Sequence, residues 1–100
     1  EILGENLTLE EGAVFKLLLS DKKLDNAEIE QVKQVAVELH QKLRNGLLQI
    51  QDWRKKAQTQ AQIRNEILNS LYSGLPHGSY PTDELDSLAA EMYQYLYRYN

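Results

Sequence analysis

Apolar residues recur at steps of three and four positions along most of the chain, which is the spacing of one face of an α-helix. The clearest stripe runs through residues 29–43, others lie in 57–72 and 85–99, and AVFKLLLS at 13–20 is a short segment that is apolar almost throughout. No segment keeps the alternation of a half-buried strand, and β-branched residues are sparse. The pattern predicts an all-α fold, a small bundle of about four helices.

Capping residues indicate where the first two helices begin. Thr8 and Glu11 have the spacing of a capping box, in which each side chain accepts a hydrogen bond from the other residue's backbone N–H. The helix behind them is expected to stop near position 20. A second helix should start at Asp25 or Asn26, which are good N-caps, and end before the Asn-Gly pair at 45–46.

Two further helices are expected in the second half. Asp52 is a natural N-cap for a third helix whose first residue is Trp53 and which ends at Gly74. The turn-rich segment LPHGSYP follows and contains both prolines of the chain. Thr82 should then cap the last helix.

Four alternating tyrosines occupy the end of this last helix, and at 100° per residue they cannot share one face. Tyr95 and Tyr99 flank the apolar stripe and are expected in the core. Tyr93 and Tyr97 lie one turn apart on another side. They either form a protein contact, for which exposed tyrosines are well suited, or pack against the preceding loop or the first helix.

The only tryptophan heads a cationic run, since Trp53 is followed at once by Arg54, Lys55 and Lys56. A helix from Trp53 would place Arg64 on the same strip. The indole either pins the helix to the core, which the burial habit of tryptophan favours, or joins these cations in a contact surface for phosphate or an acidic protein. Cations at a helix amino end are disfavoured by the dipole, so their charge is expected to serve something outside this helix.

Composition restricts the chemistry. The 100 residues suffice for one domain, and 42% hydrophobic with 26% charged residues is an ordinary globular mixture. The absence of cysteine excludes disulfides and thiol catalysis, and it agrees with a cytoplasmic location. A net charge of −4 argues against non-specific nucleic-acid binding, and no apolar run is long enough for a membrane span. Because the chain begins with Glu1, we expect a fragment of a longer protein.

No catalytic residue or metal site is predicted in this segment. The glycines form no phosphate-binding loop. His40 and His77 lack a second histidine at helical spacing and are expected to be solvated or half-buried. The acidic cluster at 83–86 is explained by the dipole of the helix that it begins.

Two runs of the chain resemble the C-terminal helical region of the restriction (R) subunit of type I restriction–modification enzymes: DWRKKAQTQAQIRNEILNSLYSGLP and YPTDELDSLAAEMYQYLYRY. The upstream segment LTLEEGAVFKLL is similar to that region's lead-in. The residues that carry the resemblance are Asp52, Trp53, Ile63, Arg64, Ile67, Leu71, Tyr72, Leu75, Pro76, Tyr93, Tyr95, Leu96 and Tyr99.

The resemblance implies a docking role rather than chemistry. In that family, the nuclease and the helicase-like motor, which uses ATP and Mg²⁺, lie in earlier parts of the R subunit, and the C-terminal helices dock onto the methyltransferase and specificity subunits. The alternatives are a direct DNA contact by the same cations and a stand-alone oligomerisation module. The residues expected to bind the partner are Trp53, Arg64, Tyr93 and Tyr97 as anchors, with Arg54, Lys55 and Lys56 as the polar rim.

Overall fold

The computed structural model describes residues 8–20 and 22–99. Its elements, in order, are α1 (Leu9–Leu19), α2 (Asn26–Arg44), the 3₁₀ turns η2 (Leu47–Gln49) and η3 (Trp53–Lys55), α3 (Ala57–Gly74) and α4 (Thr82–Tyr99). The described part of the chain contains no strand. The predicted all-α bundle of about four helices is therefore confirmed.

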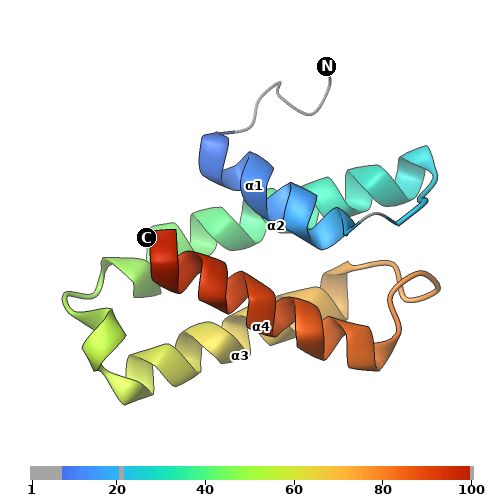
Figure 1. Ribbon diagram of the computed structural model, residues 1–100. Coiled ribbons are helices and arrows are strands. Elements are labelled where there is room, and N and C mark those ends of the chain that lie inside the picture. The colour runs from blue at the N-terminus through green and yellow to red at the C-terminus, as the bar shows by residue number, and fades with distance from the viewer. Residues whose placement is uncertain (1–7, 21, 100) are drawn as a thin grey trace.

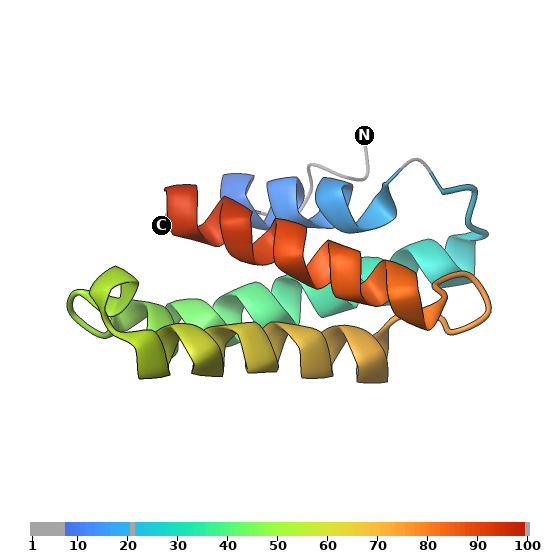
Figure 2. The ribbon, with the colours of Figure 1, turned by 60° about the horizontal axis from the view of Figure 1, so that its bottom comes forward.

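Successive helices run in opposite directions along the long axis of the molecule, which measures 39 Å (Figure 1). Figure 2 shows α1 and α4 in one layer and α2 and α3 in the other. The two 3₁₀ turns join α2 to α3 at one end of the bundle, and α4 terminates at this same end. Residues from the middle and from the end of the chain thus meet there.

The first two helices begin as the sequence predicts. The Thr8 hydroxyl accepts from the backbone N–H of Glu11 at 3.1 Å, and the Asp25 carboxylate accepts from that of Glu28 at 2.8 Å. In both cases the return hydrogen bond completes a capping box. These pairs satisfy backbone donors that the first turn of a helix leaves without partners.

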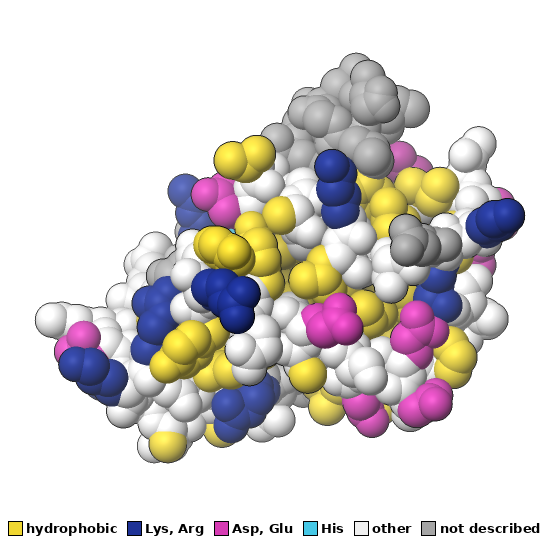
Figure 3. All heavy atoms as spheres, viewed as in Figure 1, with side chains coloured by type: hydrophobic (Ala, Val, Ile, Leu, Met, Phe, Trp, Pro, Cys, Tyr) yellow, Lys and Arg dark blue, Asp and Glu magenta, His cyan; other side chains and the backbone are white. Residues whose placement is uncertain are grey.

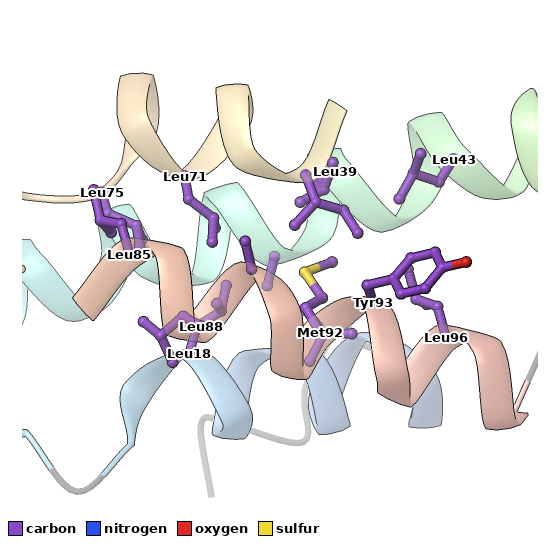
Figure 4. Close-up of a cluster of buried hydrophobic side chains, with 14 of the residues drawn as sticks. Leu18, Leu39, Leu43, Leu71, Leu75, Leu85, Leu88, Met92, Tyr93 and Leu96 are labelled. Carbon is purple, nitrogen blue, oxygen red and sulfur yellow. The ribbon is translucent and has the colours of Figure 1, made fainter. Parts of the chain in front are cut away.

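The core forms along the inner side of α4. The apolar side chains of α4 point toward those of α2 and α3, and α1 contributes Leu18 beside Leu88 (Figure 4). The stripes predicted from the sequence supply these residues, which are at most 3% exposed: Leu18, Leu39, Leu43, Leu71, Leu88, Met92 and Leu96. Burial of one such side chain contributes about 1.5–3 kcal/mol relative to leaving it in water.

The start of the third helix differs from the prediction. Asp52 lies in the left-handed region at φ 60°, and its side chain caps nothing. Trp53 belongs to η3, and Lys56 is extended, so that α3 begins only at Ala57. Local spacing favoured a cap at Asp52, but the break before Ala57 lets the indole turn inward, where it is 3% exposed.

The loop before α4 is tied to the core by a tyrosine. Tyr80 is buried, and its hydroxyl donates to the carbonyl of Leu18 at 2.6 Å. Burial raises the pKa of this phenol to about 12. The helix then begins one residue earlier than predicted, because Thr82 is already helical and the Pro81 carbonyl accepts from the N–H groups of Glu84 and Leu85.

His40 is buried at 1% exposure, so the expectation of a solvated or half-buried side chain is wrong. The reason is its neighbour across the α1–α2 contact. Glu11 is also buried, and its carboxylate accepts from the Thr8 N–H and from Gln41 Nε2, each at 3.1 Å. These bonds hold α1 over this part of α2, while both ring nitrogens of His40 lack a partner among the described residues.

The unfolding free energy should therefore fall as the pH drops below 6.5. Burial lowers the pKa of His40 from its ordinary 6.5 and outweighs the carboxylates of Glu11 and Glu10, which raise it. Above 6.5 the imidazole is neutral in both states, whereas below it the unfolded chain binds a proton that the folded chain resists. Urea unfolding from about pH 7.5 to about pH 5.5 should show this slope, and a smaller slope in His40→Leu. Equal slopes in the two proteins would contradict this account.

A second expectation concerns the close approach of α3 to α2. A Cβ on Gly74 would lie 2.5 Å from Cγ2 of Val35, whereas one on Gly12 in α1 would meet nothing within 4 Å. Gly74→Ala should lower the unfolding free energy by about 1–3 kcal/mol through overpacking. Gly12→Ala, the matched control, should raise it by about 0.5–1 kcal/mol because alanine favours the helix. Thermal or urea unfolding measures both, and stabilisation by Gly74→Ala would contradict the packing.

Candidate partner-binding surface

Three aromatic rings join η3 to the end of α4. The ring of Trp53 stands edge-on to Tyr97 at a centroid distance of 5.7 Å and to Tyr93 at 6.4 Å. Tyr93 and Tyr97 are 6.0 Å apart. Trp53 and Tyr93 are buried, whereas Tyr97 is 40% exposed. Such edge-to-face pairs contribute about 0.5–1.5 kcal/mol each beyond their burial.

Of the two roles that the sequence left open for Trp53, the structure shows the packing role, because the indole is buried in the core. Tyr93 is buried as well, with its ring beside Trp53 and under the guanidinium of Arg64 in α3. Tyr97 is the member of the trio that presents its ring to solvent. Their role in partner binding stays a prediction.

Arg54 holds the carboxyl end of α4. Its Nε donates to the carbonyl of Tyr97 at 2.7 Å, and its guanidinium lies 4.7 Å from the Trp53 ring and 5.7 Å from the Tyr97 ring. That carbonyl is one of the last four of α4, which have no partner inside the helix. The positive charge therefore stands at the negative end of a helix dipole, where it is stabilising.

This placement explains the cations that look misplaced in the sequence. Since η3 is not the first turn of α3, Arg54 serves α4 instead of opposing the dipole of α3. The charge acts outside the third helix, as expected, but within the same domain. Lys55 and Lys56 are exposed, and no ion pair of either lysine is found in residues 8–20 and 22–99.

Arg64 does not share a strip with Trp53, because the helix that would align them begins after Trp53. Its guanidinium instead lies 5.2 Å from the ring of Tyr93, and the side chain is exposed.

All the predicted partner-binding residues come together at one end of the bundle. We call them the aromatic–cation surface: Trp53, Arg54, Lys55, Lys56, Arg64, Tyr93 and Tyr97.

The other two tyrosines of α4 lie on the opposite flank of the helix. Their rings are 5.0 Å apart, with Tyr95 partly buried and Tyr99 64% exposed. The prediction that both are core residues is wrong for Tyr99, which is the last residue of α4. A shallow groove lies on this flank, lined by Glu91, Arg98 and the two tyrosines among others. Sequence reasoning missed Arg98, although a cation in the last turn of a helix is a recognisable signal.

The acidic residues that begin α4 have structural partners. The Glu84 carboxylate pairs with Lys22 Nζ at 2.8 Å, and the Asp86 carboxylate accepts from the Tyr72 hydroxyl at 2.9 Å. Within the described ranges, no three His, Asp or Glu side chains gather as a metal site would require. None of the described helices has the length and apolar character needed to cross a membrane.

A family model described as the C-terminal region of the type I restriction enzyme HindI endonuclease subunit and its like matches residues 2–98. The search of curated proteins and the search of solved structures each returned no significant match.

If Arg54 caps α4, its loss should cost stability while the loss of its neighbour should not. Arg54→Met removes the hydrogen bond to Tyr97 and the ring contacts but keeps an unbranched side chain. We expect the unfolding free energy to fall by about 1–2 kcal/mol. Lys55→Met, the matched control, should change it by less than about 0.5 kcal/mol. Equal effects of the two substitutions in urea unfolding would rule out the capping role.

Proposed function

This chain belongs to the family of C-terminal domains of HindI-like type I restriction enzyme endonuclease subunits, and we propose that it docks its subunit onto the methyltransferase and specificity subunits. In this proposal the chain catalyses no step. The ATP- and Mg²⁺-dependent work on DNA belongs to other parts of the subunit.

The observation that carries the proposal is the aromatic–cation surface. Tryptophan, tyrosine and arginine are the residue types that most often dominate the binding energy of protein interfaces. Here Tyr97 and Arg64 are exposed directly above the buried Trp53 and Tyr93. Exposed anchors resting on a buried aromatic base are a usual composition for a contact surface.

The surface is also held in place before any partner arrives. The Tyr97 ring packs against Trp53, and the guanidinium of Arg54 lies near both rings. Ordering a mobile side chain at an interface costs about 0.5–1.5 kcal/mol. A partner that contacts Tyr97 meets a side chain whose freedom is already restricted, so more of the contact energy becomes affinity.

The test compares two exposed tyrosines on opposite flanks of α4. In the full endonuclease subunit, Tyr97→Ala should weaken binding to the methyltransferase–specificity complex by roughly 5- to 30-fold, which is the loss of one interface anchor. Tyr99→Ala removes the same side chain two residues away and should change the affinity by less than about twofold. Calorimetry of the mixed subunits measures the affinity, and a thermal melt shows whether either variant has lost its fold.

Removal of residues 1–100 from the subunit is the stronger control. If the shortened subunit still binds the methyltransferase–specificity complex with unchanged affinity, the docking role is refuted.

A further inference from the structure

Positive charge is concentrated in one part of this acidic chain. The whole chain has 11 Lys and Arg against 15 Asp and Glu, but residues 42–64 contain six of the cations and only one acid, Asp52. The six cations are Lys42, Arg44, Arg54, Lys55, Lys56 and Arg64. The other residues therefore carry five cations and 14 acids, by subtraction.

The fold collects most of this charge at one end. Residues 42–64 form the last turn of α2, the two 3₁₀ turns and the first turns of α3, and α4 ends beside them with Arg98. Figure 3 shows several blue side chains on this side of the molecule, at the left of the view. We call this the basic end: Arg44, Arg54, Lys55, Lys56, Arg64 and Arg98.

Little of the charge at the basic end is neutralised by carboxylates. The ion pairs found in residues 8–20 and 22–99 are Lys22 with Glu84 and Lys42 with Glu66, and neither involves a residue of the basic end. Arg54 offsets the negative end of the α4 dipole. The other five cations are exposed: Lys55 and Lys56 follow Arg54 in the chain, Arg64 lies against the Tyr93 ring, and Arg44 and Arg98 belong to the last turns of α2 and α4.

The opposite end of the bundle is acidic. The first turns of α2 and α4 lie together there, as the hydrogen bond from the Ser79 hydroxyl to Glu28 and the ion pair of Lys22 with Glu84 show. In Figure 3 the acidic side chains gather on this side, at the lower right. The acids of the two helix starts are Asp25, Glu28, Glu30, Asp83, Glu84 and Asp86. Against these six acids stand Lys22 and Lys23 of the α1–α2 connection, so this end keeps a net negative charge.

We propose that the basic end binds a carboxylate-rich segment of the partner protein, with Tyr97 packed against that segment and the surrounding cations paired to its Asp and Glu side chains. The inference rests on the proposed docking function and specifies the chemistry of the partner surface. Complementary charge accelerates association and suppresses wrong orientations. The acidic end of the domain would be repelled by the same segment, so the domain can approach in one orientation only.

Several observations favour carboxylates over the phosphates of DNA. The net charge of −4 and the acidic end oppose the approach of a polyanion as long as DNA, whereas a short acidic segment can stay within the basic end. The centre of the surface is aromatic and buried rather than a continuous cationic track, since Trp53 and Tyr93 lie beneath Tyr97. Protein interfaces have this aromatic centre with a polar rim.

The experiment reverses charge at two places with the same change in net charge. In the full endonuclease subunit, K55E/K56E alters exposed lysines of the basic end, and K16E/K23E alters exposed lysines elsewhere in the domain. The first variant should bind the methyltransferase–specificity complex at least about tenfold more weakly at low salt, with a difference that shrinks as salt screens the charges. The second should remain within about twofold of the wild type.

A cross-linking arm identifies the partner surface. A photo-reactive residue in place of Lys55 in the assembled complex should label a protein segment rich in Asp and Glu. Reversal of those acids to Lys in the partner should restore binding by K55E/K56E and weaken binding by the unaltered subunit.

Other outcomes overturn the inference. If both charge reversals weaken binding to the methyltransferase–specificity complex equally, the effect is one of net charge and not of the basic end. Cross-links to duplex DNA, with DNA affinity lost and subunit assembly intact in K55E/K56E, would assign the basic end to DNA. If assembly is insensitive to K55E/K56E but is lost on Tyr97→Ala or on removal of residues 1–100, docking stands and the carboxylate partner fails. If removal also has no effect, both proposals fail.

Discussion

The contact of Trp53 and Arg54 with the last turn of α4 organises the end of the bundle that carries the aromatic–cation surface. It joins a 3₁₀ turn to Tyr97, 43 positions after Arg54, through an edge-on pair of rings and a charged hydrogen bond to the Tyr97 carbonyl. Without it, the Tyr97 carbonyl at the end of α4 would lose its side-chain donor, and the Trp53 ring would lose its edge-on contact with Tyr97. The same contact restrains Tyr97, and Lys55 and Lys56 follow Arg54 directly in the chain, so one interaction serves both folding and the surface that we propose for partner binding.

Features encoded within one or two helical turns could be predicted from the sequence. The capping boxes at Thr8 and Asp25 define helix starts through neighbours three residues away. The apolar stripe from Ile29 to Leu43 follows helical spacing regardless of what packs on it. The order of Trp53, Ile63, Tyr72 and the final tyrosines identified the family, which the match over residues 2–98 confirms.

Features decided by distant contacts could not be predicted. Asp52 has the chemistry of an N-cap, but the burial of Trp53 sets the local backbone, and the left-handed φ at Asp52 follows from it. Arg54 looked misplaced because its true neighbour is a carbonyl 43 positions away. His40 is buried against α1, which the sequence of its own helix does not indicate. Tyr99 is exposed because it is the last residue of α4, beyond the buried core. The seven residues proposed for binding could be named from the sequence because they fall in two short segments, 53–64 and 93–97, which the fold brings together.

The presence of a single tryptophan in the chain gives this surface its own optical reporter. The guanidinium of Arg54 lies over the ring of Trp53, and the Tyr97 ring stands at its edge. Because indole emission responds to its immediate surroundings, we expect a molecule that displaces either group to change the fluorescence of the unlabelled domain. Occupancy of the basic end can therefore be followed spectroscopically, provided that the bound molecule itself carries no tryptophan.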